Sequence, residues 1–267
     1  MSISLEDLAR RAKVSKTTVS LVINGKSEEY RISKETQKKI QVLAKEYNFK
    51  PNSTARALRL KKSLTIGLII PYLNRHFGRV AEVLEQTARE AGYQIIIAIT
   101  DDFLETEYDL INNLAARNID GLILATMMNR DQYFKNPVIK KMPVMLIDRR
   151  LEGDDIGWVV SDDETGTYDL VSTLCKEGIQ DIHFIGGIQK LSTSIDRLKG
   201  YKKALRDQGI GYDQQKVQQT GYAVKDGYEM TKNIFQKIKQ GPQAIFTSAI
   251  TLLEGLLQYT KEHDSEM

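Results

Sequence analysis

Acidic and basic side chains directly follow several short apolar runs in this 267-residue sequence. Asp148 and Arg149 follow the run VMLI, Asp101 and Asp102 follow QIIIAIT, and Asp162 follows WVVS. A carboxylate can accept hydrogen bonds from sugar hydroxyls, and a guanidinium can bind a phosphate or a pair of hydroxyls with two parallel hydrogen bonds. The pattern therefore indicates a binding site for a polar small molecule. The alternative for each residue is a salt bridge at the end of a strand.

The sequence lacks the motifs of catalysis and of metal binding. The stretch GGIQKLS does not have the spacing of a phosphate-binding P-loop, and no G-x-G-x-x-G follows an apolar run. His76, His183 and His263 are scattered without metal-ligand spacing, and Cys175 is the single cysteine. No nucleophile with its base can be assembled from these residues. We therefore expect no enzyme, no cofactor and no metal; turnover of a sugar phosphate would argue for an enzyme instead.

The elements that must position these side chains begin at Ser63, where apolar runs start to alternate with amphipathic stretches. The expected strands are Thr65–Ile70, Gln94–Thr100, Gly121–Thr126, Val144–Ile147, Trp158–Ser161, Ile182–Ile185 and Ala244–Thr247. The expected helices lie near Arg79–Ala91, Glu105–Arg117, Thr165–Glu177, Ile195–Gln208, Gly227–Lys239 and Thr251–Glu262. This alternation predicts an α/β body of parallel sheets with helices on both faces. Ligands bind such sheets outside the carboxyl ends of the strands.

The first fifty residues predict a helix, a short turn and a second helix. Leu5, Leu8, Ala9 and Ala12 recur on one helical face, and Ser4 before them has the position of an N-cap. These residues predict an all-α unit ahead of the α/β body.

The second helix is expected to begin after Ser15 and to end at Asn24-Gly25, and a third helix is expected from Ser33. The outward face of the second helix carries Lys16, Thr17, Ser20 and Leu21. A helix fits the major groove of DNA, where such side chains contact base edges. The alternative is an ordinary helical hairpin with a polar surface.

Charge is distributed unevenly along the chain. Residues 1–62 hold 15 Lys and Arg against 6 Asp and Glu, whereas the remainder holds 23 against 29. A basic N-terminal part on an acidic body favours contact of that part with a polyanion. The apolar runs are too short to span a bilayer, and the N-terminus has no apolar signal-peptide core, so we expect a cytoplasmic protein without membrane contact.

The stretch PNSTARALRLKK, residues 51–62, has a helical pattern that is basic and carries only Leu58 and Leu60 as large apolar residues. Isolated helices shorter than about 12–15 residues are marginal in water, so this segment needs a partner to become helical. The alternative is a plain interdomain linker.

The run SLEDLARRAKVSKTTVSLVINGK resembles the DNA-binding headpiece of the lactose-repressor (LacI/GalR) family, and PNSTARALR followed by SLTIGLIIP is similar to its hinge helix and effector domain. VINGKSEEYRIS, GYQIIIAITDD and DRLKGYKKAL most resemble the branch of sucrose-operon and fructose repressors. Two positions depart from the family pattern. Lys13 stands where Gly is common and would cost roughly 1 kcal/mol if left-handed, and Leu21 stands where many members have a polar residue.

The resemblance implies the site residues and the partners. The DNA-binding residues it implies are Ser4, Leu5, Ser15, Lys16, Thr17, Thr18, Ser20, Leu21, Asn24, Tyr30, Asn52, Ala55, Leu58 and Arg59. The effector-binding residues it implies are Tyr72, Asp148, Arg149 and Arg197. The hinge helix would fold on DNA with its copy from a second subunit, and Leu58 would wedge between base steps of the minor groove. The implied partners are a palindromic operator in double-stranded DNA, a sugar or sugar phosphate, and a second copy of the chain.

The expected organisation is a headpiece at 1–50, a hinge at 51–62, and two effector subdomains at 63–161 and 162–267. Compared with the family, the second subdomain lacks its last strands, so a C-terminally truncated and incomplete body is expected. The expected function is repression of sucrose or fructose utilisation genes, relieved by a fructose-type sugar or its phosphate. Four alternatives are a global regulator responsive to fructose phosphates, a product with DNA binding but no effector response, a periplasmic-type sugar-binding module, and an inert product.

Overall fold

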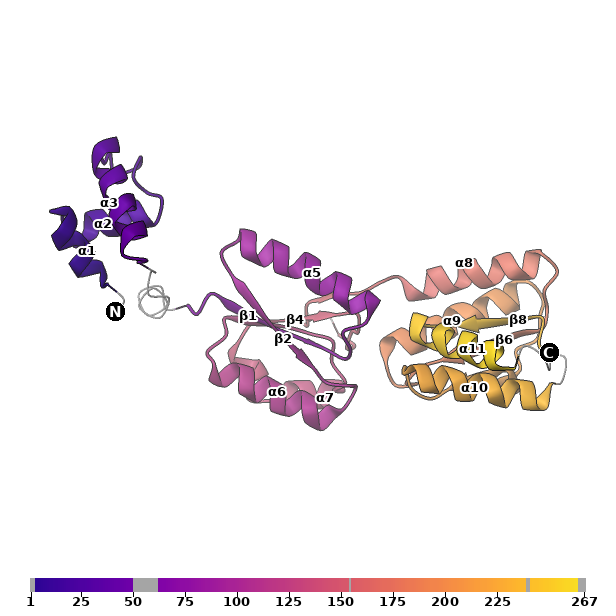
Figure 1. Ribbon diagram of the computed structural model, residues 1–267. Coiled ribbons are helices and arrows are strands. Elements are labelled where there is room, and N and C mark those ends of the chain that lie inside the picture. Colours follow the sequence, from indigo (N-terminus) through magenta and orange to yellow (C-terminus); the bar gives the residue numbers. More distant parts are fainter. Residues whose placement is uncertain (1–2, 50–61, 154, 239–240, 264–267) are drawn as a thin grey trace. The chain divides into compact units, whose positions relative to one another are not determined.

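The computed structural model describes residues 3–49, 62–153, 155–238 and 241–263 (Figure 1). The chain forms two compact units, Met1–Thr65 and Ile66–Met267. Most of the segment interpreted as a hinge helix, residues 51–61, lies outside the described residues. The site predictions at Asn52, Ala55, Leu58 and Arg59 lie outside them as well.

The first unit contains the three predicted helices, α1 (Leu5–Ala12), α2 (Lys16–Ile23) and α3 (Lys34–Glu46). A serine caps each one: the side chains of Ser4, Ser15 and Ser33 accept a hydrogen bond from the backbone N–H three residues later. These bonds satisfy donors that a helix start leaves without a partner. The core is made of Leu8, Ala9, Ala12, Val19, Val22 and Ile40.

The turn between α1 and α2 depends on Lys13, whose φ of 60° and ψ of 42° place it in the left-handed region. The N–H of Val14 donates to the Ala9 carbonyl oxygen at 3.1 Å and closes the end of α1. A lysine therefore occupies a conformation that glycine adopts at lower cost, as the comparison with the family pattern had indicated.

The second unit begins with a five-stranded sheet in the order β2-β1-β3-β4-β5. Its strands are β1 (Thr65–Ile70), β2 (Gln94–Ile99), β3 (Gly121–Leu124), β4 (Val144–Ile147) and β5 (Trp158–Val159). Three neighbouring pairs, β1–β3, β3–β4 and β4–β5, run parallel. Helix α5 (Arg75–Glu90) covers one face, and α6 (Leu104–Ala116) and α7 (Arg130–Lys135) lie on the other (Figure 1). The carboxyl ends of these strands therefore open onto one edge.

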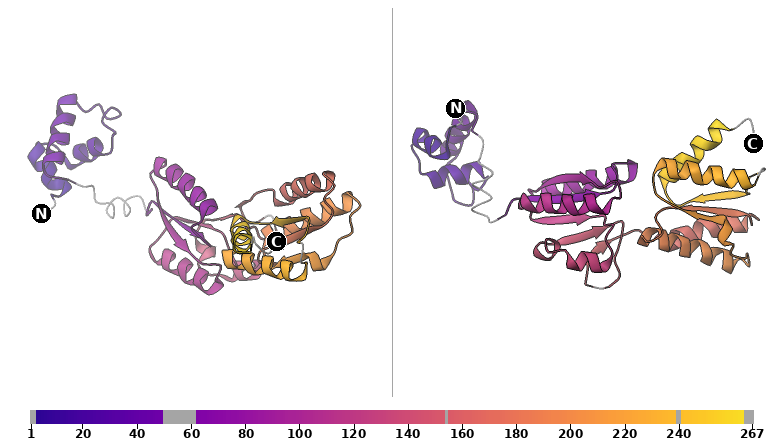
Figure 2. Two further views of the ribbon diagram at one scale, coloured as in Figure 1. Left: turned by 45° about the vertical axis from the view of Figure 1, so that its right-hand side comes forward. Right: turned by 90° about the horizontal axis from the view of Figure 1, so that it is seen from below.

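A three-stranded sheet in the order β7-β6-β8 follows. Its strands, β6 (Ile182–Gly186), β7 (Val217–Gln219) and β8 (Ala244–Thr247), are again parallel. Helices α8 (Asp163–Lys176) and α9 (Ser192–Asp207) pack on one face, and α10 (Val224–Lys237) and α11 (Ile250–Glu262) pack on the other (Figure 2). Because Ile182 and Phe184 face α8 and α9 while Ile185 faces α10 and α11, the strand β6 is buried on both sides.

The fold class predicted from the sequence, an α/β body with a helical N-terminal unit, is confirmed. One strand and one α-helix were not predicted. Strand β7 reads VQQ and has one apolar residue, and α7 has six residues, too few to show a helical period. Helix α5 begins four residues, and helix α8 two residues, before the predicted start, because Asn74 and Asp162 cap them ahead of the apolar stripe.

Candidate functional site

Helix α2 presents the residues that the sequence assigned to DNA contact. Ser15, Lys16, Thr17 and Asn24 are exposed, and Thr18, Ser20 and Leu21 are half-buried. Ser4 and Tyr30 are exposed outside α2, and Leu5 at the start of α1 is half-buried.

Local hydrogen bonds hold part of this surface in place. The Ser15 hydroxyl lies 2.8 Å from that of Thr18, and the Asn24 amide donates to the Ser20 carbonyl oxygen at 2.6 Å. Lys16 approaches Glu6 at 4.0 Å in a fully solvated pair, which is worth little and leaves the ammonium free to exchange partners. A capped helix with an ammonium and hydroxyl groups on its outer face has the chemistry required for contact with phosphates and base edges.

The second unit contains a cavity of about 230 Å³ at the carboxyl ends of both sheets. It is lined by Pro71, Tyr72, Asn74, His76, Phe77, Asp148, Arg149, Thr193, Arg197, Tyr222, Ser248, Ala249, Ile250 and Thr251. All four residues predicted to bind an effector, Tyr72, Asp148, Arg149 and Arg197, are among them. Residues that follow β1, residues that follow β4 and a residue of α9 thus meet at the place where ligands bind in open α/β sheets. This cavity is called the cleft below.

Arg149 is held in the cleft wall by a buried ion pair. Its guanidinium lies 2.7 Å from the carboxylate of Asp102, and the two side chains are 4% and 6% exposed. Arg149 also donates to the sulfur of Met127, and the Tyr72 hydroxyl donates to Asp102 at 2.8 Å. Burial, followed by the hydrogen bond to Asp102, raises the pKa of Tyr72, so this tyrosine stays a neutral donor. The Asp102 carboxylate therefore fixes two cleft residues at once.

Asp148 reaches the cleft from a left-handed backbone. Its φ is 62°, and Asp101 and Asp102 at the end of β2 have φ values of 52° and 60°. Non-glycine residues in this region store strain and cluster at functional sites. The Asp148 carboxylate lies 3.4 Å from Nε2 of His76, and this contact raises the pKa of the imidazole.

Arg197 projects from the second turn of α9. Its guanidinium donates to Asp163 at 2.9 Å and to the Ser248 carbonyl oxygen at 2.7 Å. Burial raises the pKa of the Asp163 carboxyl, and the charge of Arg197 opposes that shift. The guanidinium thereby joins the start of α8 to the loop after β8 at the wall of the cleft.

Glu107, which was not predicted to have a role, stabilises the loop that packs against the cleft. Glu107 of α6 is fully buried and accepts hydrogen bonds from the Thr126 hydroxyl at 2.5 Å and from the Met127 N–H at 2.6 Å. Burial is the main reason that the pKa of this carboxyl is raised. Because Met127 contacts Arg149, Glu107 positions the loop behind the cleft arginine.

Sequence reasoning missed several cleft residues. His76 was set aside because its spacing suits no metal, yet it pairs with Asp148 in the cleft. Tyr222 and Ser248, which line the cleft, and Asp163, which pairs with Arg197, carried no local signal, since distant elements bring them together. Asp162, one of the carboxylates that follow an apolar run, caps α8 by accepting from the Thr165 N–H and does not line the cleft.

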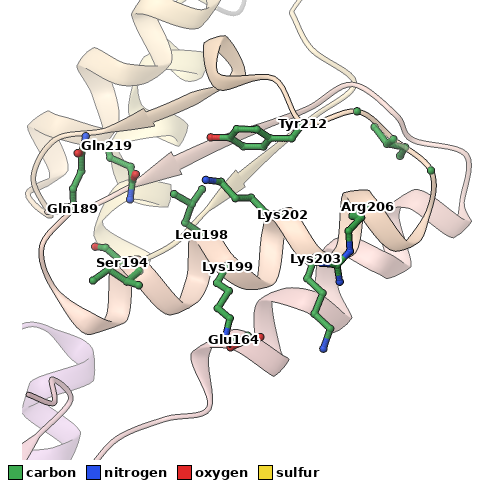
Figure 3. Close-up of a pocket in the computed structure, with 14 residues that line it drawn as sticks. Glu164, Gln189, Ser194, Leu198, Lys199, Lys202, Lys203, Arg206, Tyr212 and Gln219 are labelled. Atoms are coloured by element: carbon green, nitrogen blue, oxygen red, sulfur yellow. Dashed lines mark ion pairs between the residues drawn. The ribbon is translucent and has the colours of Figure 1, made fainter. Parts of the chain in front are cut away.

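A second hollow, of about 1100 Å³, lies along the outer side of α9 (Figure 3). Its cations already have surface partners. Lys199 pairs with Glu164 at 2.6 Å, and Lys202 lies over the Tyr212 ring at 4.4 Å (Figure 3). These contacts are typical of a solvated basic surface.

Within the described residues, no group of three or more His, Cys, Asp or Glu side chains could hold a metal ion. The helices described there are also too short or too polar to span a bilayer.

Comparison with known proteins places both units in one family. Residues 4–52 match the model described as bacterial regulatory proteins of the lacI family, and residues 63–264 match periplasmic binding proteins and the sugar-binding domain of the LacI family. The sucrose operon repressor of Klebsiella pneumoniae is 36% identical over 98% of this chain and 78% of its own length. The fructose operon regulatory protein of Vibrio cholerae is 35% identical over 99% of this chain and 81% of its own length.

Solved structures show the same relationship. The Cra dual regulator of Pseudomonas putida, in complex with fructose 1-phosphate, aligns with a TM-score of 0.68 at 30% identity over 74% of each chain. The lac repressor dimer bound to its operator aligns with a TM-score of 0.81 over 99% of this chain and 79% of that one, at 22% identity, and so supports the fold. The chain therefore belongs to the LacI family of bacterial regulatory proteins and is a DNA-binding transcriptional repressor.

Proposed function

We propose that this repressor controls sucrose or fructose utilisation genes and leaves its operator when a fructose-type sugar or its phosphate binds the cleft. One observation carries the proposal: the neighbours Asp148 and Arg149 and the distant Arg197 line a single cavity. Two relatives that are at least 35% identical are named for the sucrose and fructose operons. Arginine and aspartate side chains provide the donors and acceptors that a polyol needs.

On DNA, the chain acts as a homodimer on a palindromic operator, with one α2 helix in the major groove of each half-site. The proposed α2 contacts are Ser15, Lys16, Thr17, Thr18, Ser20, Leu21 and Asn24. Leu58 is proposed as the wedge in the minor groove, and Arg59 is available for phosphates. The remaining proposed DNA contacts are Ser4, Leu5, Tyr30, Asn52 and Ala55. Sugar binding favours a state of the second unit that cannot hold both hinge segments on the operator, which relieves repression.

The experiment has two steps. The 267-residue chain first selects duplex DNA from a random pool near physiological salt, where an enriched palindrome is expected. Release of the chain from that palindrome is then titrated with fructose and with its phosphate esters. Enrichment of half-sites alone would contradict dimeric binding, and the absence of release by every sugar would contradict an effector role for the cleft.

Arg197→Ala tests the cleft directly. This variant is expected to bind the operator as tightly as the wild type and to lose at least tenfold in sensitivity to the sugar, because a charge-assisted contact is removed. Lys202→Ala, on the same helix but on the hollow outside the cleft, is the matched control and is expected to respond as the wild type does. Equal sensitivity of the two variants to the sugar would mean that the sugar binds outside the cleft.

A second candidate is a global regulator that responds to fructose phosphates. The observation in its favour is the solved structural relative that contains fructose 1-phosphate. The two candidates differ in the number of operators, because a global regulator would select a degenerate sequence that recurs at many promoters. Genome-wide mapping of bound DNA separates them.

A further inference from the structure

Each cationic side chain that lines the cleft already has a carboxylate partner. Among the described lining residues Arg149 and Arg197 are cations, and His76 becomes one when it is protonated. Their partners are Asp102 at 2.7 Å, Asp163 at 2.9 Å and Asp148 at 3.4 Å, respectively. Neither arginine therefore lacks a counter-charge before any ligand enters.

A phosphate ester is unfavourable in a cleft whose arginines are already neutralised. Such a group carries a charge of about −1.5 to −2 at pH 7 and has to find its own counter-charges when water is removed from it. Each arginine that the ester could contact already carries a carboxylate, and Asp102 and Asp163 are only 6% and 11% exposed. The ester would therefore bring a second negative group to a cation that is already neutralised, in a site with little water to screen the repulsion.

The groups that remain available in the cleft are suited to hydroxyls. The Ser248 hydroxyl and the Nε–H of Arg149 are buried, and among the described residues neither has a hydrogen-bond partner. The Asp148 carboxylate is 21% exposed and retains acceptor sites, since its contacts with His76 and Arg149 are long, at 3.4 and 3.7 Å. Phe77 and Ile250 add apolar surface for the C–H face of a ring. A sugar hydroxyl both donates and accepts, so it can bond with a hydroxyl group as well as with a carboxylate that lines the same cleft.

The size of the cleft limits the ligand as well. Its volume of about 230 Å³ lies below the range of roughly 300–1,000 Å³ found for drug-sized ligands. A single sugar ring fits this volume better than a disaccharide does.

We propose that the cleft selects an uncharged monosaccharide and discriminates against the phosphate ester of the same sugar. This inference rests on the proposed role of the cleft as the effector site. It assigns two positions a part in specificity: Asp102 and Asp163 neutralise the arginines that would otherwise attract a phosphate.

Isothermal titration of the full chain with fructose, fructose 1-phosphate, fructose 6-phosphate and inorganic phosphate tests the proposal. Fructose is expected to bind at least tenfold more tightly than either ester, and inorganic phosphate is not expected to compete with it. Tighter or equal binding of an ester would overturn this inference and leave the proposed effector role intact. Binding of no sugar, with operator binding retained, would overturn both.

A second test uses a variant that should gain affinity for the phosphate esters, a result that a misfolded protein could not produce. Asp163→Asn keeps an oxygen that accepts from Arg197 but removes the neutralising charge. It is expected to raise the affinity for the phosphate esters at least tenfold and to change the affinity for fructose less than threefold. Glu164→Gln is the matched control, because it removes the next carboxylate in α8, which pairs with Lys199 outside the cleft. Ester affinities that do not respond to Asp163→Asn, or that respond equally to both variants, would contradict the assigned role of Asp163.

Discussion

At the scale of single residues, the cleft depends on a carboxylate that does not line it. Replacing Glu107 by alanine leaves the Met127 N–H and the Thr126 hydroxyl buried without an acceptor. Each such group costs roughly 1–3 kcal/mol, so we expect the free energy of unfolding to fall by about 3 kcal/mol. Urea denaturation of the wild type and the variant measures this difference.

Glu105→Ala is the matched control for this prediction, because Glu105 is exposed on the same helix. It is expected to change the free energy of unfolding by less than about 0.5 kcal/mol. A similar loss in both variants would mean that helix α6 is sensitive to any change, and that the two hydrogen bonds are unimportant.

The contact between His76 and Asp148 is expected to make the free energy of unfolding depend on pH. The contact with Asp148 raises the pKa of the imidazole in the folded state, so its contribution is complete below the ordinary value of about 6.5 and is lost as pH rises through the raised value. Because the side chain is 52% exposed, the contribution is expected to stay below about 1 kcal/mol. Urea denaturation of the wild type and of His76→Gln at several pH values checks it. An advantage of the wild type that grows as the pH rises would contradict the assignment.

At the scale of elements, the turn between α1 and α2 can be improved. Lys13 has a φ of 60°, and glycine adopts this conformation without strain. Lys13→Gly is therefore expected to raise the stability of the first unit by about 1 kcal/mol. Lys39→Gly, at an exposed position inside α3, is the control of opposite sign and is expected to cost about 1 kcal/mol. Calorimetry of the full chain measures both, and a loss at Lys13 would show that its side chain has a role of its own.

The proposed hinge makes a separate prediction. Leu58→Ala is expected to weaken binding to the operator at least tenfold and to leave binding to unrelated DNA unchanged, because an apolar wedge acts only where the duplex is kinked. Leu60→Ala, two residues further on, is the matched control. Fluorescence anisotropy with operator and with unrelated duplexes gives both affinities, and parallel losses on the two DNAs would exclude a wedge.

The sequence predicted the elements better than it predicted the cleft. Strands such as Thr65–Ile70 and Val144–Ile147 have continuous apolar runs and were predicted with their observed bounds. Asp148, Arg149 and Arg197 were found because each stands at a strand end or in a matching motif. Asp163 and Ser248 could not be found in this way, since their contacts with Arg197 depend on how distant elements pack. The neutralisation of the cleft arginines depends on such contacts, so it could not be predicted from the order of residues in the sequence.

At the scale of the whole molecule, the two compact units should respond separately to the sugar. A ligand present at 100 times its dissociation constant stabilises the part that binds it by about 2.7 kcal/mol. The unfolding transition of the second unit is expected to rise by roughly 5–10 °C, and that of the first unit is expected to remain constant. Differential scanning calorimetry with and without fructose checks this, and a shift of both transitions would mean that the units unfold together.

The left-handed backbone at Asp101, Asp102 and Asp148 restricts how these positions can vary among natural variants. Glycine would relieve the backbone but delete the carboxylate, and a β-branched residue would add strain. Asparagine preserves the shape and the backbone preference at the cost of the charge. At Asp148, which is 21% exposed, one nucleotide change from Asp to Asn therefore keeps the backbone and alters which ligands the cleft accepts, whereas the same change at Asp102 would leave the buried guanidinium of Arg149 without its counter-charge. Sugar preference in this lineage can diverge through one codon without any rearrangement of the sheets.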